Sequence, residues 1–270
     1  MPELSIIILT WNTAEITKKC VLSIEKYLKN KIDYEIIVAD NGSTDNTENV
    51  FSTLKSIKYI KHQTNYGFAK GNNLATKHAK GKYLSFLNSD MEFKNDSFVK
   101  MYTFFKKNSS IAAIGPKFLN PDLTPQSSVF PPQTAFNAFK EFFLNVPSFS
   151  KYLPIGNTPV SVWAISGGAM LIRADIFKQV NGWNEKYFFY FEDLDLCRQL
   201  QQLGQKIYYF PTAQVIHHHG ASGKNLADAG NQWRRLIPSS KLYHGNIKHY
   251  LLFLIIWSGQ KWQKIKKLFG

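Results

Sequence analysis

The chain has 270 residues, of which 44% are hydrophobic and 15% aromatic, and it carries a formal net charge of +14. This is enough to bury the core of one large domain, alone or with an appendage, and no low-complexity tract or internal repeat is present. Residues 1–10 have a strand pattern without a basic start, and no apolar run approaches the roughly 18–20 residues that span a bilayer. We therefore expect neither a secretory signal nor a membrane-spanning helix.

The positive charge is concentrated at the C-terminus. Residues 229–270 contain eight Lys and Arg residues and no Asp or Glu. Such a segment predicts contact with an anionic surface, which can be nucleic acid, acidic lipid or a phosphorylated substrate. The two cysteines, Cys20 and Cys197, lack metal-binding spacing; free buried thiols are expected, and one disulfide stays possible.

Strand and helix patterns alternate through the first 90 residues. Apolar, β-branched runs predict buried strands at 4–10, 34–39, 58–60 and 83–87. Helical periodicity follows at 14–29, and further helices are predicted after the turn at 40–45, with Ser43 or Thr44 as N-cap, and from the segment 65–73. This alternation predicts right-handed βαβ units in a doubly wound α/β sheet.

Polar residues follow each of these predicted strands. They are Thr10 and Asn12, Asp40 and Asn41, Asn65, and finally Asn88 and Asp90. Ligands of such sheets bind beyond the carboxyl ends of the strands, so these residues together predict a nucleotide pocket. Asp90 is a natural ligand for Mg²⁺ or Mn²⁺, although an Asp in this position is also typical of an ordinary turn. Neither a phosphate loop nor a G-x-G-x-x-G after the first strand is present, which argues against an ATPase or a nicotinamide enzyme.

A run of five aromatic residues, 187–191, leads to Glu192 and Asp193 at the start of a predicted helix. An apolar stripe marks that helix, and Gly204 follows its end. Acids favour any helix N-terminus, which is the structural explanation of the pair. An aromatic wall would also raise the pKa of a carboxylate and make it a usable general base.

Five motifs occur in one order over about residues 3–220. They are SIIILTWN at 5–12, DNGSTD at 40–45, N-x-GFA-x-GNN at 65–73, LNSD at 87–90 and FED-x-DL at 191–196. Together they resemble the family 2 glycosyltransferases, and most closely the rhamnosyltransferase-like branch. The resemblance implies a GT-A fold, Rossmann-like with a mostly parallel sheet flanked by helices. It also implies inverting transfer of a sugar from a nucleoside diphosphate sugar, dTDP-rhamnose or a UDP-sugar, to a saccharide or lipid-linked acceptor in bacterial surface polysaccharide synthesis.

The resemblance also implies roles for individual residues. Those expected to bind the nucleotide sugar are Thr10, Asn12, Asp40, Asn65, Gly67, Asn73, Asn88 and Ser89. Asp90 would bind Mg²⁺ or Mn²⁺ as the remaining acid of a D-x-D motif, since Asn88 replaces its first acid. His217 would complete the metal site, whereas its neighbours His218 and His219 would be solvated or structural, because adjacent strand residues face opposite ways.

For the acceptor side, the resemblance implies contacts from Glu192, Trp163, Gly167 and Gly168. The glycines interrupt a predicted strand pair at 162–173, where tight packing is an equally good explanation. Direct displacement needs only one base and one electrophile on the diphosphate. The resemblance implies that the base is the second acid of the pair, Asp193, with Glu192 orienting the acceptor. Asp195 would point elsewhere and pair with Arg198 or Gln199.

The expected division is a catalytic domain at 1–228 and a basic helical region at 229–270. Within the domain, 1–115 would bind the nucleotide sugar and 116–228 the acceptor, with 118–159 as a flap that is helical only at 135–145. The apolar run 251–257 and the lysines after it predict a helix that lies on an anionic leaflet, or one that packs on the domain. We therefore expect a cytoplasmic protein, peripheral on the inner membrane.

Two other functions are considered. A sugar nucleotidylyltransferase would need a Gly-rich loop with Lys or Arg after the first strand, and residues 11–14 do not supply one. A non-catalytic basic module would explain the C-terminal charge but leave the acids at the strand ends unexplained. No motif of nucleic-acid recognition is found, so no nucleic-acid partner is expected.

Overall fold

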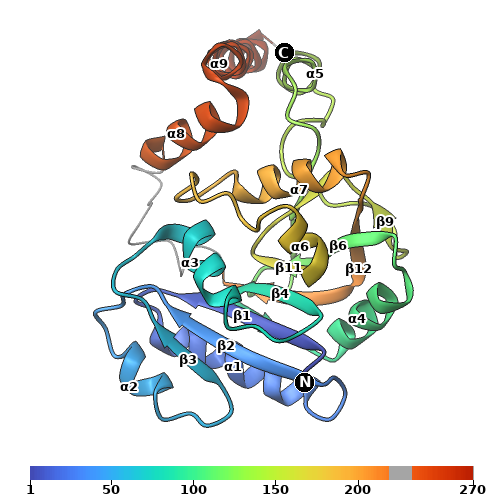
Figure 1. Cartoon of the computed structure of the whole chain (residues 1–270). Coiled ribbons are helices and arrows are strands. Elements are labelled where there is room, and N and C mark those ends of the chain that lie inside the picture. Colours follow the sequence, from blue (N-terminus) through green and yellow to red (C-terminus); the bar gives the residue numbers. More distant parts are fainter. Residues whose placement is uncertain (219–232, 270) are drawn as a thin grey trace.

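The computed structural model describes residues 1–218 and 233–269, and its centre is a mixed β-sheet (Figure 1). Four parallel strands come from the first third of the chain: β1 (Leu4–Thr10), β2 (Tyr34–Asp40), β3 (Lys58–Lys61) and β4 (Tyr83–Asn88). They lie in the order β3-β2-β1-β4, with β1 parallel to both of its neighbours. The carboxyl ends of these strands therefore meet at one edge of the sheet.

The sheet continues with strands from the rest of the chain. β11 (Ala169–Arg173) lies antiparallel between β4 and β6 (Ile111–Leu119), followed by β12 (Lys206–His217) and the edge strand β5 (Met91–Phe93). β7 (Pro125–Gln126) and β9 (Val160–Ser161) pair with β6 and β12. One sheet thus contains strands from both predicted halves, and the boundary expected between residues 115 and 116 falls inside β6.

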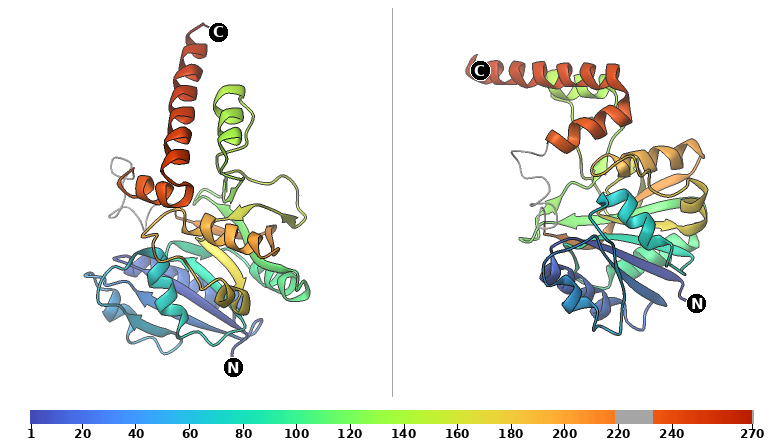
Figure 2. Two further views of the ribbon diagram at one scale, coloured as in Figure 1. Left: turned by 45° about the horizontal axis from the view of Figure 1, so that its top comes forward. Right: turned by 60° about the vertical axis from the view of Figure 1, so that its left-hand side comes forward.

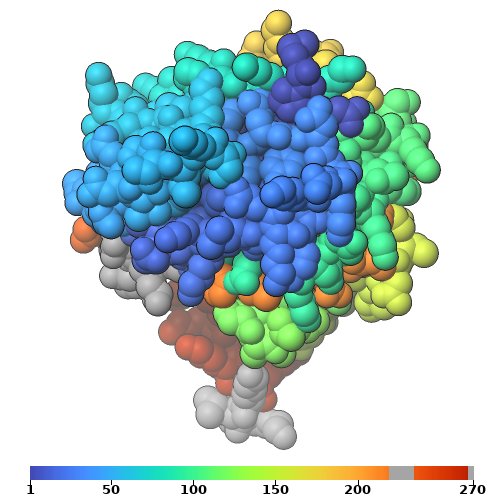
Figure 3. Space-filling model, turned by 90° about the horizontal axis from the view of Figure 1, so that it is seen from below, coloured from blue at the N-terminus to red at the C-terminus, as the bar shows by residue number. Residues whose placement is uncertain are grey.

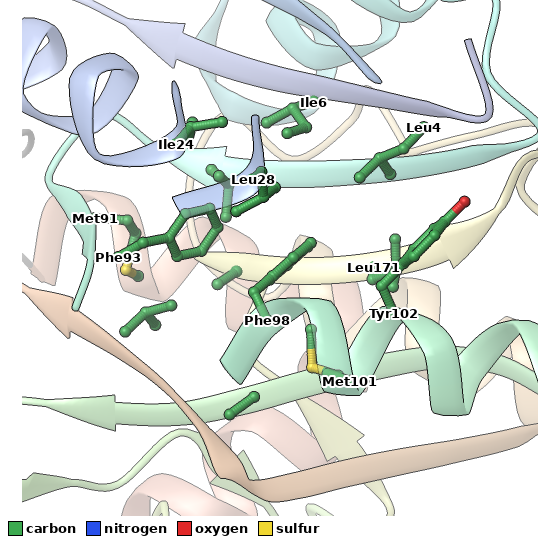
Figure 4. Close-up of a cluster of buried hydrophobic side chains, with 14 of the residues drawn as sticks. Leu4, Ile6, Ile24, Leu28, Met91, Phe93, Phe98, Met101, Tyr102 and Leu171 are labelled. Atoms are coloured by element: carbon green, nitrogen blue, oxygen red, sulfur yellow. The ribbon is translucent and has the colours of Figure 1, made fainter. Parts of the chain in front are cut away.

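Helices cover both faces of the sheet (Figure 1). One buried cluster contains residues of α1 (Ala14–Leu28), α2 (Thr47–Phe51) and α4 (Ser97–Lys107); the other contains residues of α3 (Gly67–Thr76), α6 (Ala174–Gln179) and α7 (Glu192–Gln202). In β1, Ile6 and Ile8 belong to the first cluster and Ile7 to the second, because successive side chains of a strand point to opposite faces. Figure 4 shows part of the first cluster, with side chains from α1, β5 and α4.

Three helices lie outside these layers. They are α5 (Ala135–Leu144), α8 (Trp233–His244) and α9 (Asn246–Phe269). Both views of Figure 2 show α9 beside α5 and apart from the sheet. The helix predicted at 135–145 is thereby confirmed, while the boundary predicted between 228 and 229 lies outside the described residues. Within residues 1–218 and 233–269, no helix combines the length and apolar character that crossing a membrane requires.

The predicted start of α2 is wrong. The helix begins at Thr47, not at a cap formed by Ser43 or Thr44. Ser43 is engaged in the preceding loop, where its hydroxyl accepts a hydrogen bond from the backbone N–H of Asn12 at 2.9 Å. Asp45 instead accepts from the backbone N–H of Thr47 at 3.1 Å. The side chain that pairs with a free N–H of the first turn therefore lies after Ser43 and Thr44 in the chain.

The predicted strand pair at 162–173 is also wrong, because its two strands do not pair with each other. β10 (Ala164–Ile165) pairs with β8 (Val129–Phe130) in a separate small sheet, whereas β11 joins the main sheet. The two glycines between β10 and β11 let the chain change sheets. Cys20 and Cys197 are buried free thiols, as expected.

Candidate active site

A pocket opens where the carboxyl ends of β1, β2 and β4 meet. It is partly open to solvent, as a site that admits a ligand from outside must be. Of the eight residues predicted to bind a nucleotide sugar, the five that line it are Thr10, Asn65, Gly67, Asn88 and Ser89. The other lining residues are Leu9, Trp11, Asn41, Phe68 and Phe189.

Asn41 organises the loop on one side of this pocket. Its Nδ2 donates to Asn65 Oδ1 at 2.9 Å and to the backbone carbonyl of Gly67 at 3.1 Å. Asn65 Oδ1 also accepts from the backbone N–H of Gly67 at 2.9 Å. The remaining polar atom, Asn65 Nδ2, is buried and has no hydrogen-bond partner among the described residues. Since buried amides are normally satisfied, this donor is available to a bound ligand.

The other three predicted residues, Asn12, Asp40 and Asn73, are not among those that line the pocket. Asn12 Oδ1 accepts from the backbone of the loop after β2 at 2.8 Å. Asp40 is fully buried and accepts from the hydroxyl of Tyr59 at 2.6 Å. Asn73 Nδ2 donates to the backbone carbonyl of Trp183 at 2.8 Å. In this structure these three side chains hold the loops that shape the pocket.

Gly167 and Gly168 join the pocket to the start of α7. The carbonyl of Gly168 accepts from the backbone N–H of Asn88 at 2.8 Å, and the N–H of Gly167 donates to Asp193 Oδ2 at 3.1 Å. A Cβ at Gly168 would lie 2.9 Å from Met91 Cε and 3.3 Å from Asn88 Nδ2. A side chain there would press on Met91 and, more lightly, on Asn88, so glycine suits this close approach to the pocket wall.

The backbone just before α7 adopts a conformation that aromatic residues rarely take. Tyr190 and Phe191 have φ values of 72° and 69°. Left-handed conformations of bulky residues cost on the order of 1–3 kcal/mol each and cluster at active sites. The segment is held in place by the carbonyl of Phe188, which accepts from the N–H of Phe68 at 2.8 Å. Gly67 allows this contact, because a Cβ there would lie 2.3 Å from the same carbonyl oxygen.

Of the two acids that follow, Glu192 is buried and Asp193 is half-buried, and the charge of each affects the ionisation of the other. Burial, and then the charge of Asp193, raises the pKa of Glu192 to about 8. Burial also raises the pKa of Asp193, but Lys151 and the backbone N–H groups of Gly167 and Leu194 favour its charged form. Neighbouring carboxyl groups lose their protons in two steps. We assign the first ionisation to Asp193, so Glu192 keeps the proton at neutral pH.

Asp90 and His217 face each other beside the pocket, with 3.6 Å between Oδ1 and Nε2. His217 Nδ1 lies 2.6 Å from Gln126 Oε1, while Gln126 Nε2 donates to Asn120 Oδ1 at 3.0 Å. The amide oxygen of Gln126 therefore faces the histidine and holds the proton on Nδ1. The Nε2 lone pair then points toward the carboxylate, a donor set that fits a divalent cation. No group of three or more His, Cys, Asp or Glu gathers for a metal in the part of the chain that the structure describes.

Comparison with known proteins identifies the family. Residues 5–180 match the family described as glycosyl transferase family 2, and residues 126–265 match glycosyl transferase family group 2. The chain belongs to glycosyl transferase family 2. It is therefore a transferase that acts on sugars, as the sequence motifs implied.

Two named relatives of this family 2 glycosyltransferase are rhamnosyltransferases. Rhamnosyltransferase WbbL of Escherichia coli (strain K12) is 27% identical over 210 residues, which cover 74% of this chain and 78% of WbbL. The N-acetylglucosaminyl-diphospho-decaprenol L-rhamnosyltransferase of Mycobacterium tuberculosis (strain H37Rv) is 26% identical over 212 residues, covering 69% and 67% of the two chains.

A solved structure confirms the fold class. The crystal structure of GalNAc-T7 with UDP, GalNAc and Mn²⁺ superposes with a TM-score of 0.65 at 16% identity. The match covers 80% of this chain and 44% of that one. At this identity the likeness concerns the fold alone, and the predicted α/β GT-A fold with C-terminal helices is confirmed.

Not every residue predicted for the glycosyltransferase site lies at the pocket. Trp163 lines a second pocket whose lining residues differ from those of the first. Asp195 accepts hydrogen bonds from Arg198 and Gln199, which confirms the predicted pairing. The backbone N–H of His218 donates to the carbonyl of Asp90, but its ring pairs elsewhere, with Nε2 2.9 Å from Glu92 Oε2; His219 lies outside the described residues.

Sequence reasoning missed several residues of the site. Trp11 and Phe68 line the pocket and lie inside the quoted motifs, so the motifs contained the signal. Phe189 lies in the aromatic run, where nothing distinguishes it from its neighbours. Lys151 and Gln126 lie in the irregular segment 118–159, and no sequence pattern connects them with Asp193 or His217.

Lys151 provides a pH test of the candidate base. Its charge favours the ionised form of Asp193, so Lys151→Gln should raise the pKa of Asp193 further. A base acts only when it is deprotonated; the acidic limb of the pH–rate profile should therefore move to higher pH, with a smaller change in the plateau rate. Lys140→Gln is the matched control, since that ammonium lies over the ring of Phe136, 5.5 Å from its centroid. If Lys151→Gln and wild type had equal pH–rate profiles, Lys151 would have no influence on the ionisation of Asp193.

Proposed function

We propose that this protein is an inverting glycosyltransferase that moves a sugar from a nucleoside diphosphate sugar to a saccharide or lipid-linked acceptor. The observation that carries the proposal is the connection between a pocket at the strand ends, which Asn41, Asn65 and Asn88 help to line, and Asp193, through Gly167 and Gly168. The names of the two rhamnosyltransferase relatives favour dTDP-rhamnose over a UDP-sugar as donor. The process would be bacterial surface polysaccharide synthesis, carried out by a peripheral protein on the cytoplasmic face of the membrane.

The proposed reaction is a single displacement with Asp193 as base. The acceptor hydroxyl oxygen forms a bond to the anomeric carbon as the bond between that carbon and the diphosphate oxygen breaks. The hydroxyl proton passes to the carboxylate of Asp193, whose charge is favoured by the N–H of Gly167. Attack from the face opposite the leaving group inverts the anomeric centre, and no covalent enzyme intermediate is needed.

Glu192 would act beside the base as a neutral acid. Because its pKa is raised to about 8, it can donate a hydrogen bond to an acceptor oxygen near pH 7. The donor would occupy the pocket lined by Thr10, Asn65 and Asn88, where Asn65 Nδ2 offers a buried hydrogen bond. Asp40 and Asn73 would support this pocket through the loops that they hold.

Asp90 and His217 are the residues that would hold Mg²⁺ or Mn²⁺. Two protein ligands are sufficient where the diphosphate of the donor supplies further oxygens. When bound, the ion neutralises charge on the departing diphosphate. Asp90 would contribute the hard carboxylate oxygen that such a cation prefers, and His217 a borderline imidazole nitrogen 3.6 Å from it.

Gln126 is proposed to position His217 for this role. Gln126→Leu removes the acceptor that holds the proton on Nδ1, so the ring can turn or change tautomer. Loss of such an outer partner typically weakens metal binding by about 10–100-fold. We expect that loss for Mn²⁺ in the presence of a nucleoside diphosphate, measured by calorimetry, with a tautomer change visible in ¹⁵N NMR spectra. Gln126→Glu keeps an acceptor oxygen and should restore binding; equal affinities in all three proteins would contradict the positioning role.

A donor panel tests the proposed function directly. The protein is incubated with dTDP-rhamnose or UDP-sugars, Mn²⁺ or Mg²⁺, and a lipid-linked or free saccharide acceptor. We expect transfer with inverted anomeric configuration, read by NMR of the product. A retained configuration would refute the direct displacement. Pyrophosphate release from a nucleoside triphosphate and a sugar phosphate would instead support a nucleotidylyltransferase.

A further inference from the structure

The helices α5 and α9 are packed against each other, although more than a hundred residues separate them in the chain. Gln263 Nε2 donates to the carbonyl of Phe142 at 3.0 Å and to Asn145 Oδ1 at 3.1 Å. A Cβ at Gly259 would lie 2.5 Å from Phe142 Cβ, so glycine is what allows the helices to approach. Figure 2 shows that the pair projects from the domain, and we call it the α5–α9 pair.

Both helices of the α5–α9 pair expose large apolar side chains. The exposed residues include Phe136, Phe139 and Leu144 of α5 and Tyr250, Phe253, Leu254 and Trp257 of α9. Their exposed fractions range from 43% for Phe139 to 68% for Phe136. On α9, residues 250, 253, 254 and 257 follow helical spacing and share one face, opposite the buried Leu252 and Gly259. Exposed apolar side chains gathered on a helix face in this way mark an interaction site.

Lysines accompany the exposed aromatic rings. Lys140 lies 5.5 Å from the ring centroid of Phe136, Lys261 lies 6.0 Å from that of Trp257, and the ammonium of Lys266 lies 5.2 Å from the ring of Trp262. Residues 229–270 contain no acid, and the one acid of α5, Glu141, accepts hydrogen bonds from the backbone N–H groups of residues 148–150, so the basic charge of the surface prevails. Two such surfaces would therefore repel each other, whereas anionic lipid headgroups would complement the charge.

The chemistry of the α5–α9 pair matches a membrane interface. Aromatic side chains prefer the headgroup level of a bilayer, and lysines beside them reach the anionic phosphates. α9 presents an apolar face and several lysines, as helices that lie in the plane of a leaflet do, and α5 adds an apolar face with one lysine, Lys140. No helix of the described residues is long and apolar enough to span the bilayer, so the pair would lie on it.

The helix α8 connects this surface to the candidate active site. Ser239 Oγ donates to the carbonyl of Phe189 at 2.9 Å, and the guanidinium of Arg235 lies 4.3 Å from the ring centroid of Phe188. From the other side, Arg198 of α7 donates to the carbonyl of Tyr243 at 3.0 Å. The basic extension is thus attached to the aromatic segment that precedes the two acids.

We propose that the α5–α9 pair is a two-helix docking surface for an anionic membrane leaflet, and that α8 holds the acceptor side of the active site at a fixed height above that leaflet. Binding to the leaflet is a property of the surface itself. Its use in presenting a lipid-linked acceptor rests on the proposed function.

Vesicle binding of the full chain tests the proposal. We expect co-sedimentation with vesicles of phosphatidylcholine and phosphatidylglycerol, weaker binding at high salt, and little binding to phosphatidylcholine alone. Phe139→Asp combined with Trp257→Asp should abolish binding, because it places charge in the apolar surface of both helices. Lys261→Gln combined with Lys264→Gln should weaken binding to the anionic vesicles by roughly fivefold for each lysine removed.

Matched controls come from α1, on the face shown in Figure 3 and at the opposite end of the molecule from α9 in Figure 1. Leu22→Asp introduces charge at an exposed leucine, and Lys18→Gln with Lys19→Gln removes two exposed lysines. Both controls should bind vesicles like wild type, and circular dichroism should show all variants folded. Equal binding by the α5–α9 variants and the controls would overturn the proposal.

Two further outcomes are informative. Wild type could fail to bind vesicles and self-associate instead, while the double Asp variant is monomeric. The surface would then be an interface between copies of the chain, and the proposal would fail. With a water-soluble acceptor the double Asp variant should transfer sugar at the wild-type rate, and with a vesicle-borne acceptor it should be slower. Absence of transfer by every protein would refute the proposed function, whereas vesicle binding alone decides the docking surface.

Discussion

Asp193→Asn is expected to lower kcat by about 10²–10⁴-fold, the range that a positioned general base contributes. The amide keeps the size of the carboxyl group and an oxygen that can accept the N–H of Gly167, which lies 3.1 Å from Asp193 Oδ2. It cannot take up a proton at neutral pH. Binding of the donor, measured by calorimetry with the sugar nucleotide found active, should change little because the nucleotide pocket is lined by other residues.

Glu192→Gln is the control that separates the two neighbouring acids. Because burial and the charge of Asp193 raise the pKa of Glu192 to about 8, this carboxyl group is neutral at pH 7, as an amide is. The variant should therefore keep most of its rate at pH 7 and diverge from wild type only at higher pH, where wild-type Glu192 loses its proton. If Asp193→Asn kept the wild-type rate and Glu192→Gln lost activity, Glu192 would be the base instead.

Local patterns in the sequence were sufficient to predict the first half of the sheet. The β-branched runs predicted β1 to β4 to within a residue, because a buried parallel strand needs apolar side chains on both faces. The polar residues after those strands predicted where a pocket would open. In the structure Thr10, Asn65 and Asn88 line a pocket at this edge of the sheet.

Local sequence patterns do not predict which strands pair when they are far apart in the chain. The segment 169–173 has the apolar character of a buried strand, but nothing in it specifies insertion between β4 and β6. Lys151 and Gln126 lie in a segment without periodicity, and they reach Asp193 and His217 only through the tertiary fold. The aromatic run predicted a helix start. The left-handed backbone of Tyr190 and Phe191 could not be predicted, because bulky residues rarely adopt that conformation.

Asp90→Asn should weaken Mn²⁺ binding by more than about 100-fold, since loss of an outer partner alone costs about 10–100-fold. The substitution keeps the shape of the side chain and removes the charge that a hard divalent cation requires. The backbone carbonyl of Asp90, which accepts the N–H of His218 at 2.9 Å, is unaffected, so the turn should persist. Calorimetry of Mn²⁺ with a nucleoside diphosphate measures the loss without reference to turnover.

Asn88→Asp is the complementary variant, because it restores the acid that the D-x-D motif has at this position. Asn88 already lines the pocket, and its N–H is fixed to the carbonyl of Gly168 at 2.8 Å, so a carboxylate there would face the same space. If the ion binds beside Asp90, the added charge should tighten Mn²⁺ binding, and combining it with Asp90→Asn should recover part of the loss. If neither substitution changed the affinity for Mn²⁺, the ion would bind elsewhere. The diphosphate would then be held by the pocket and His217 without Asp90.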